Sequence, residues 1–415
     1  MKICVIGAGV VGVTTAYDLA RRGHDVQLVD AHATPAQETS FANGGQLSYS
    51  YVAPLASPDV WATLPAWLLR RDSPLRLIPR ADPHQWRWTL AFALACTAHT
   101  ARVNTAALLA LSYLSRDTLD QMLAETPIAF HHVRSGKLVV FRDPRKVARA
   151  RALVDYQSGL GASQTVLDAG QTIALEPALE PMRAHLAGAV HTPGEAVGDC
   201  RAFTQALFDQ AQARHGVRVH MGVRVRELVR ERARIVAART DAGDLQADAY
   251  VLATCMHTRT LLHPLGQSVP LYPLKGYSLD VALAPEDHQA PHISVTDYER
   301  RTVYARIGST LRVAAMVDIG ARDAAVDPER IDQIKQQVRQ FLPHLPLQHA
   351  HAWAGMRPAT PTGKPLIGRS PGAANLWLNV GQGALGFTLA CGSARLLSTL
   401  MAEEMPPIDP TPFAP

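Results

Sequence analysis

The sequence predicts an α/β protein made of two domains that alternate along the chain, one with a parallel sheet and one with an α+β fold on a mixed or antiparallel sheet. Three observations lead to this expectation. The first thirty residues read as strand, helix and strand, this rhythm stops after residue 48, and it returns after residue 198. A chain of 415 residues is also too long to fold around a single hydrophobic core, so two domains are expected.

The first thirty residues form a βαβ unit around a glycine-rich turn. An apolar run over residues 2–6 precedes Gly7-Ala8-Gly9-Val10-Val11-Gly12, which reads G-x-G-x-x-G, and a helical pattern over 11–22 leads to a second strand over 26–29. In a Rossmann-type site the first glycine permits the turn, the second lets the backbone approach a pyrophosphate, and the third lets helix and sheet pack. The helix N-terminus offers free N–H groups to the phosphates. We therefore predict a dinucleotide site here.

Asp30 and the loop behind it extend this site. Asp30 ends the second strand, where a carboxylate binds a ribose diol, although a surface carboxylate at a strand end would look the same. Residues 31–46 are mostly small hydroxyl, amide and glycine residues. Such a loop supplies hydrogen bonds to phosphate and sugar and runs close to a flat ring, whereas an ordinary polar turn would have the same composition.

Residues 49–197 break the first rhythm and read as a second domain. Helical patterns cover 85–97 and 105–125, a strand covers 137–141, and a helix covers 144–160. Asp199 is a suitable N-cap for an amphipathic helix over 201–215, and strands follow at 217–221, 224–230, 235–240 and 249–254, the middle two as a hairpin. Three further strands are expected in the sheet of the second domain, at residues 272–278, 302–305 and 311–315. Asp327-Pro328 then starts a helix that runs to about residue 341.

The expected division follows from this alternation. It assigns residues 1–48, 198–262 and 352–403 to the nucleotide domain, 49–197 and 263–351 to the second domain, and 404–415 to a C-terminal tail.

Composition excludes several classes of protein. Hydrophobic content of 47% and charged content of 19% describe an ordered globular chain, and a net charge of +5 is too dispersed for nucleic-acid binding. Five cysteines without a C-x-x-C pair indicate reduced thiols and no structural zinc, and no metal site is expected from His344, His349 and His351 in their loop. Residues 1–30 do not read as a signal peptide, and the apolar run 88–98 is shorter than the ~20 residues of a membrane span, so a cytoplasmic protein is expected.

Further motifs lie outside the first βαβ unit. Residues 38–46 read E-T-S-x-A-N-x-G-Q, residues 273–278 read P-L-K-G-Y-S, and residues 355–361 read G-x-R-P-x-T-P. Residues 381–386 repeat G-x-G-x-x-G between a strand at 375–380 and a helix to about residue 401. No strand and acid follow within ~20 residues, so this second motif predicts an anion site at a helix N-terminus.

In this order, the motifs resemble those of the FAD-dependent D-amino-acid dehydrogenases, within the larger D-amino-acid/glycine oxidase family. The resemblance covers residues 1 to about 400 and implies non-covalent FAD. It also implies hydride transfer from the substrate Cα to flavin N5, hydrolysis of the imino acid to a 2-oxo acid and ammonia, and electron transfer to a quinone or other carrier. Two positions depart from the pattern: Cys255 in Ala253-Thr254-Cys255, where a glycine is frequent, and Thr362, where an acid is common.

The resemblance implies roles for individual residues. Arg357 is expected to bind the substrate carboxylate, supported by Tyr51 and Tyr277, because the planar guanidinium pairs bidentately with a carboxylate. A structural ion pair is the alternative. The residues expected to contact FAD are Gly7, Gly9, Val10, Val11, Gly12, Asp30, Ala31, Thr39, Ser40, Asn43, Gly44, Gly45, Gln46, Val225, Thr254, Gly355, Gly381, Gly383, Ala384, Leu385, Gly386 and Thr388.

Other functions remain open at this point. They are an oxygen-using D-amino-acid oxidase or glycine/sarcosine-type oxidase, a D-proline or D-hydroxyproline dehydrogenase, a non-catalytic flavoprotein, and, from the βαβ unit alone, an NAD dehydrogenase. Residues 61–88 interleave tryptophan with arginine, namely Trp61, Trp67, Trp88, Arg70, Arg71, Arg76, Arg80 and Arg87. That pattern suits a peripheral contact with the inner face of the cell membrane, and equally a packing segment with solvated arginines.

Overall fold

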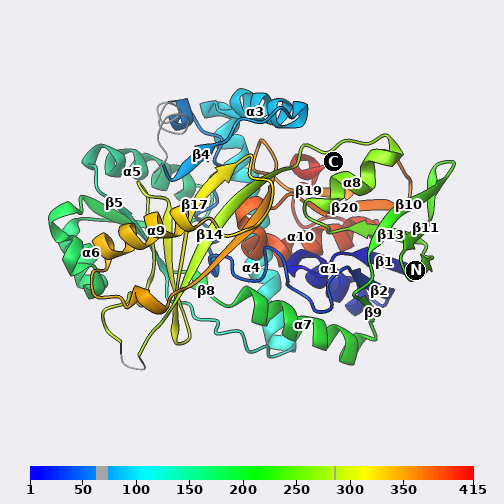
Figure 1. The fold of residues 1–415 in the computed structure, drawn as a ribbon, viewed down its shortest axis with the longest axis horizontal. Coiled ribbons are helices and arrows are strands. Elements are labelled where there is room, and N and C mark those ends of the chain that lie inside the picture. The colour runs from blue at the N-terminus through cyan, green and yellow to red at the C-terminus, as the bar shows by residue number, and fades with distance from the viewer. Residues whose placement is uncertain (62–72, 285–286) are drawn as a thin grey trace.

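The computed structural model describes residues 1–61, 73–284 and 287–415. Figure 1 shows two lobes, each built around one large sheet, with a long helix between them. The predicted fold class is confirmed, because one sheet is largely parallel and the other is mixed. Trp67, Arg70 and Arg71 of the proposed membrane segment lie outside the described residues.

The first sheet has six strands in the order β19-β20-β13-β1-β2-β9. All neighbours are parallel except β19 and β20. The strands come from distant parts of the chain: β1 (Lys2–Ile6), β2 (Asp25–Asp30), β9 (Arg218–Met221), β13 (Ala249–Leu252), β19 (Leu366–Arg369) and β20 (Leu376–Val380). β13 and β20 are buried throughout, as expected for parallel strands covered on both faces.

Four helices pack around this sheet and build its core. They are α1 (Val10–Arg21), α4 (Ala98–Glu125), α7 (Cys200–His215) and α10 (Gly386–Met401). α7 begins at the predicted N-cap, since the Asp199 side chain accepts a hydrogen bond from the Ala202 N–H, and it ends at Gly216 with φ +66°. The stretch Gly383–Met401 has the length and composition of a membrane span, but 72% of its apolar window is buried inside the protein. Burial in the core therefore accounts for its composition.

The second sheet runs β18-β14-β17-β16-β15-β5-β7-β6, with β4 on β17. Its strands are β4 (Leu75–Leu77), β5 (Lys137–Phe141), β6 (Thr165–Leu167), β7 (Gly188–Thr192), β14 (Tyr272–Ala282), β15 (Ser294–Asp297), β16 (Thr302–Ile307), β17 (Thr310–Ile319) and β18 (His351–Ala359). Only β15/β5 and β17/β4 are parallel. In Figure 1, α5 (Pro144–Ser158), α6 (Ala169–Leu175) and α9 (Pro328–Phe341) belong to this lobe.

Smaller elements complete the described chain. β10 (Val225–Glu231), β11 (Arg234–Thr240) and β12 (Gly243–Leu245) form an antiparallel sheet, which includes the predicted hairpin. β3 (Gln46–Leu47) pairs with β8 (Ala196–Val197), and α3 (Pro83–Ala95) and α8 (His257–Leu262) lie at the periphery. Turns of 3-10 helix occur at Pro177–His185, His263–Leu265, Leu347–His349, Gly383–Leu385 and Thr411–Phe413.

Two elements differ from the expected division of the chain. β18 pairs with β14 along nine residue pairs in the second sheet, although its residues from 352 onward were expected in the nucleotide domain. α4 contributes Leu108, Leu111 and Leu119 to the core of the first sheet, although it was expected in the second domain. Both segments thereby bring residues of one domain to the boundary with the other.

Candidate active site

A cavity of about 1180 Å3 is lined by residues of both large sheets. Ile6, Val29 and Asp30 line it from the ends of β1 and β2, and Leu274, Met356 and Arg357 line it from β14 and β18. The carboxyl ends of neighbouring parallel strands are the usual ligand position in α/β folds. The cavity is therefore the candidate site.

The glycine-rich turn has the geometry that the motif predicts. Gly7 has φ +106°, and a Cβ there would lie 2.5 Å from the Ala253 carbonyl oxygen. A Cβ on Gly12 would lie 1.7 Å from the Gly7 carbonyl oxygen, so Gly12 serves helix packing and does not line the cavity. A Cβ on Gly9 would come no closer than 3.5 Å to its nearest neighbour, the Ser40 hydroxyl, so the backbone of Gly9 is open to a ligand.

Asp30 is held in one orientation by the backbone around it. Its Oδ2 accepts a hydrogen bond from the Ala8 N–H at 2.6 Å, and its Oδ1 accepts one from the His32 N–H at 2.8 Å. Each carboxylate oxygen offers more than one acceptor direction, so a diol can still be bound. The carboxylate thus stands at the edge of the cavity beside the glycine turn.

The loop over residues 31–46 is fixed between the two domains. The Ser40 hydroxyl accepts from the Val10 N–H at 3.0 Å, and the Asn43 side chain accepts from the Gly45 N–H. At the end of the loop, Thr388 of α10 donates its hydroxyl to the Gln46 carbonyl at 3.3 Å. The loop therefore runs along the cavity from α1 to α10.

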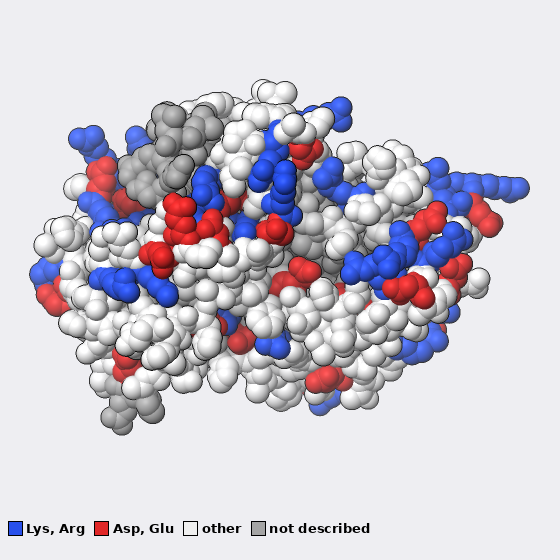
Figure 2. All heavy atoms as spheres, viewed as in Figure 1, with Lys and Arg blue, Asp and Glu red and all other residues white. Residues whose placement is uncertain are grey.

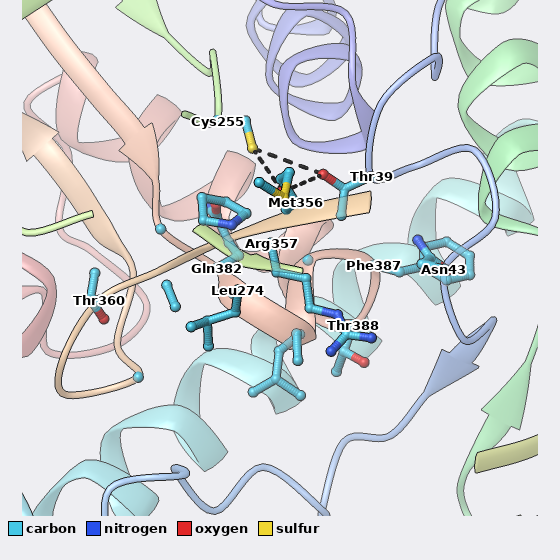
Figure 3. Close-up of a pocket in the computed structure, with 18 of the residues that line it drawn as sticks. Thr39, Asn43, Cys255, Leu274, Met356, Arg357, Thr360, Gln382, Phe387 and Thr388 are labelled. Atoms are coloured by element: carbon cyan, nitrogen blue, oxygen red, sulfur yellow. Dashed lines mark hydrogen bonds between the residues drawn. The ribbon is translucent and has the colours of Figure 1, made fainter. Parts of the chain in front are cut away.

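Cys255 has a backbone conformation that glycine adopts readily. It has φ +50°, a left-handed conformation that few side-chain-bearing residues adopt. Its Sγ lies 3.6 Å from the Met356 carbonyl oxygen, to which the Thr39 hydroxyl also donates at 3.2 Å, as Figure 3 shows. Burial raises the pKa of the Cys255 thiol to about 11, so it remains a thiol at neutral pH. The cysteine thus occupies a left-handed position beside the cavity, where glycine would also fit.

The second glycine motif opens α10 at the cavity wall. Gly381 and Gly383 have φ +86° and +57°, and the turn Gly383–Leu385 leads directly into the helix. None of the described side chains caps the first N–H groups of α10. An uncapped helix N-terminus with its partial positive charge suits an anionic or electron-rich ligand group.

Arg357 extends from β18 into this cavity (Figure 3). Its guanidinium lies against the backbone of β14, because a Cβ on Gly276 would be 2.2 Å from Nη2. Burial lowers the pKa of Arg357 to about 10. Within residues 1–61, 73–284 and 287–415, no hydrogen bond or ion pair to its guanidinium is found. The structural ion pair that was the alternative role of Arg357 is thus absent from the described residues, where its guanidinium has no partner and faces the cavity.

The two tyrosines expected beside Arg357 lie in different places. Tyr51 lines the cavity, and burial raises the pKa of its hydroxyl to about 12. Tyr277 does not line it: the hydroxyl donates to Asp318 Oδ2 at 2.8 Å, inside the core of the second sheet. Successive residues of a strand point to opposite faces, so Gly276 faces Arg357 and Tyr277 faces away. The expectation that Tyr277 supports Arg357 at the substrate site is therefore wrong, because the Tyr277 side chain lies in the core of the second sheet.

Most of the expected cofactor residues border the cavity. Gly355 does not, because it makes room for the Trp353 ring, which a Cβ would approach to 2.1 Å. The expected FAD contacts that do line the cavity are Gly7, Gly9, Val10, Val11, Asp30, Ala31, Thr39, Ser40, Asn43, Gly44, Gly45, Gln46, Val225, Thr254, Gly381, Gly383, Ala384, Leu385, Gly386 and Thr388.

Lys137 also lines the cavity and was missed by the sequence reasoning. It is the first residue of β5 and is 1% exposed. A lysine at the start of an otherwise apolar strand was the available signal, but strand ends often carry an exposed lysine.

Comparisons with known proteins agree with this geometry. The family model described as DAO, FAD dependent oxidoreductase, matches residues 2–400. The chain is 48% identical to D-amino acid dehydrogenase 2 of Ralstonia nicotianae, covering 100% of this chain and 99% of that protein. It is 49% identical to D-amino acid dehydrogenase 2 of Pseudomonas aeruginosa, covering 100% and 98%.

Solved structures share the fold at lower identity. Glycine oxidase from Geobacillus kaustophilus has a TM-score of 0.76 at 21% identity, covering 100% of this chain and 98% of that one. L-proline dehydrogenase from P. horikoshii has a TM-score of 0.74 at 16% identity, covering 97% and 93%.

The residues of the cavity fit FAD. The glycine turn and the α1 N-terminus suit a pyrophosphate, Asp30 suits a ribose, and the uncapped N-terminus of α10 suits the electron-rich end of a flavin ring. Since the family model matches nearly the whole chain and full-length relatives share about half of its residues, this chain belongs to the DAO family of FAD-dependent oxidoreductases.

Proposed function

We propose that this chain oxidises D-amino acids to imino acids, which hydrolyse to 2-oxo acids and ammonia. The observation that carries the proposal is the half-buried guanidinium of Arg357, which has no partner among the described residues and lies in the same cavity as the glycine-rich turn. The names of the curated relatives given above support the choice of D-amino acids. FAD, when bound, supplies the two-electron chemistry, and the protein supplies position and electrostatics.

Arg357 has the chemistry to fix one end of an amino acid. A guanidinium offers two parallel N–H donors that match a carboxylate, and the bond is stronger where water is excluded. Removing a cation from water without a partner is costly, and the lowered pKa of Arg357 reports that cost. A substrate carboxylate would offset it. Holding the carboxylate would also bring the Cα–H to one reproducible position, on which hydride transfer depends.

Anaerobic bleaching of the flavin absorbance tests this proposal. The purified, FAD-loaded protein should lose its visible absorbance under argon with D-alanine or other D-amino acids and keep it with the L-enantiomers. Arg357→Met should keep its FAD and lose ~10²-fold or more in kcat/KM, because removing one partner of a buried charge pair costs ~2–5 kcal/mol. Bleaching of the Arg357→Met protein with near-normal KM would contradict the role of this residue. A wild-type protein that no amino acid bleaches would make a non-catalytic flavoprotein the better reading.

We propose a quinone, and not oxygen, as the electron acceptor. The support is that the curated relatives are named dehydrogenases, whereas the similar structure from Geobacillus kaustophilus is named an oxidase. Turnover with a soluble quinone analogue under argon should exceed turnover with air as sole acceptor. Faster turnover with oxygen would favour an oxidase, and a strong preference for D-proline would favour a D-proline dehydrogenase.

The outer face of α3 supports a peripheral contact with the inner face of the cell membrane. Trp86, Leu90 and Leu94 follow one another at helical spacing and are 48%, 62% and 71% exposed. Trp61 is also exposed. An amphipathic surface of this kind lies at the headgroup level of a bilayer.

Three residues of the proposed segment serve the fold instead. Trp88 is buried and donates its indole N–H to the Ala359 carbonyl at 2.9 Å. Arg76 pairs with Asp318, and Arg80 donates to the Gly320 carbonyl. The membrane proposal therefore rests on the outer face of α3 and not on these side chains. Figure 2 shows basic and acidic side chains interspersed on the visible face, without a broad patch of one sign.

Flotation with vesicles of anionic lipid tests the membrane contact. The wild-type protein should float with the vesicles, and Leu90→Glu/Leu94→Glu should remain at the bottom of the gradient. Leu175→Glu, which changes an exposed leucine on the distant helix α6, should behave like wild type. Absence of flotation by the wild-type protein at low salt would end this part of the proposal.

A further inference from the structure

We propose that Lys137 accepts the proton of the substrate ammonium group, so that the amino acid is oxidised as its neutral amine. The inference rests on the proposed function, because it requires an amino acid whose carboxylate is held by Arg357. It gives a role to a buried ionisable group in the cavity that neither FAD binding nor carboxylate binding requires.

The position of Lys137 is fixed by three neighbours. Its Nζ donates to Gln46 Oε1 at 2.6 Å and to the Ser48 hydroxyl at 3.0 Å. It also lies 4.5 Å from the ring centre of Tyr51. Gln46 closes the FAD loop and is tied to Thr388 near the start of α10, so Lys137 stands at the flavin end of the cavity and not at the Asp30 end.

The hydrogen bonds of Lys137 leave room for a proton. A neutral amine has two N–H groups and one lone pair, and the Gln46 and Ser48 oxygens use both N–H groups. The remaining lone pair can accept a hydrogen from a ligand. After protonation the third N–H has the Tyr51 ring face beside it, which attracts a cation. Both protonation states therefore fit the same geometry.

The charges around Lys137 favour titration near neutral pH. Burial lowers the pKa of Lys137 to about 8, although the nearby Glu195 carboxylate raises it. Glu195 accepts from the Tyr49 and Ser50 N–H groups, and no carboxylate of the described residues forms an ion pair with Lys137.

The other ionisable groups nearby behave differently. Tyr51 stays neutral because burial raises its pKa to about 12. Burial also lowers the pKa of His191 on the adjoining strand β7, so this side chain is neutral above pH 7. Arg301 and Tyr298, in the turn between β15 and β16, are the other ionisable groups that act on Tyr51. Among these groups of the described residues, Lys137 has the pKa closest to the range between pH 7 and 9, and the charge of Glu195, whose own pKa burial raises, acts on it.

The cavity offers no buried carboxylate to a substrate ammonium at this end. Of the acidic residues that line the described cavity, Asp30 and Glu38 belong to the nucleotide end. Asp59 and Asp323 are 56% and 73% exposed and face Arg149 and Lys275. Arg357 and Lys137 line the same cavity, and a substrate ammonium that lies beside a protonated Lys137 would place two like charges together, which repel strongly where water is excluded. One of the two must lose a proton.

The proton and electron balance follows from that requirement. An N–H bond of the ammonium breaks, and an N–H bond forms at Lys137 Nζ. The lone pair left on the substrate nitrogen forms the C=N bond as the Cα–H leaves with its electron pair for FAD, giving an iminium. Lys137 then returns its proton to water before the next turnover.

Proton release on ligand binding tests the inference without turnover. The probe is 2-aminoisobutyrate, an amino acid with no Cα–H, and binding to the FAD-loaded enzyme is followed by calorimetry in two buffers of different ionisation enthalpy. At pH 7 both amines start protonated, so wild type should release about one proton; at pH 9 Lys137 starts neutral, so release should fall towards zero. Lys137→Met should release close to none at pH 7. Lys275→Met, which removes another buried lysine that does not line the cavity, should behave like wild type.

The pH dependence of kcat/KM provides the second measurement. In wild type it should rise through an apparent pKa of about 8, as Lys137 becomes neutral. Lys137→Met and Lys137→Gln should lose this limb, and their rates should then follow the ionisation of the substrate amine. Lys137→Arg, which keeps the charge and accepts no proton, should not restore it.

The outcomes separate this inference from the proposed function. A wild-type protein that no D-amino acid bleaches overturns the proposed function and this inference with it. A wild-type protein that is bleached but releases no proton at pH 7 overturns the inference alone, without any variant. Lower activity of Lys137→Met with an unchanged pH profile also overturns it, because that result describes a structural lysine.

Discussion

Replacing Gly276 by alanine moves the Arg357 guanidinium without altering its charge. The new Cβ would lie 2.2 Å from Nη2 and 2.3 Å from Cζ of Arg357. Ordinary carbon contacts lie near ~3.5–4.0 Å, so the guanidinium has to shift by more than ~1 Å. Gly276 has no left-handed φ, and the end of an arginine side chain is flexible, so the fold itself should tolerate alanine.

The expected effect falls on catalysis and not on stability. A misplacement of about 1 Å in a positioning group costs roughly 10²-fold in rate. We therefore expect Gly276→Ala to lower kcat/KM for D-alanine by ~10²-fold, with FAD content unchanged and the free energy of unfolding altered by less than ~1 kcal/mol. Stopped-flow reduction under argon, flavin absorbance and thermal unfolding measure these three quantities.

Gly194→Ala is the matched control, because a Cβ there would have no atom of the described residues within 4 Å, and it should match wild type in all three measurements. Near-normal kcat/KM in a folded, FAD-loaded Gly276→Ala protein would show that the position of the Arg357 guanidinium does not matter.

Four further predictions address single residues. Asp30→Ala should lose FAD on dilution, measured by ultrafiltration, because the ribose contact and the anchor of the Ala8 N–H both disappear; undiminished FAD affinity would refute its role. Gly383→Val should lower the flavin reduction potential or abolish FAD binding, since φ +57° strains a β-branched residue at the start of α10; a normal potential would count against the helix N-terminus. Tyr277→Phe should lose about 1–2 kcal/mol of unfolding free energy with the hydrogen bond to Asp318, yet keep kcat/KM within roughly twofold; a large kinetic defect at normal stability would return Tyr277 to the substrate site. Cys255→Gly should retain FAD, whereas Cys255→Val should weaken it and the fold, because only glycine relieves φ +50°; equal FAD affinity in both would show that the backbone shape there is not required.

The sequence was sufficient to predict the backbone geometry around the glycine motifs. The glycines at 7, 9 and 12, the acid at 30 and the second glycine motif at 381–386 each depend on local backbone geometry, which a motif encodes directly. The direction of Tyr277 is not local in this sense. β14 is buried on almost its whole length, so no alternation of polar and apolar residues indicates which side chains face the cavity.

Long-range contacts explain the other differences between sequence and structure. Lys137 meets Gln46, Ser48 and Tyr51 across about ninety positions of sequence, and no spacing rule connects them. β18 belongs to the second sheet because it pairs with β14. That partner lies some eighty residues upstream, and the glycine motif that follows β18 in the sequence had suggested the nucleotide domain instead. For such a strand, the local sequence pattern predicts that a strand forms but does not predict which sheet it joins.

The order of strands in the first sheet has a consequence for biosynthesis. β1 is flanked by β13, which pairs Ile3 with Ala249, and β13 is flanked in turn by β20, which pairs Leu252 with Leu378. During synthesis, the N-terminal βαβ unit therefore cannot complete its sheet until β13 and β20 have been made. Contacts between residues so far apart in the sequence form slowly. If FAD binds only after the sheet has closed, its binding would shift the equilibrium towards the closed sheet by mass action. The supply of flavin during synthesis, and not only during turnover, should then set how much active protein a cell accumulates.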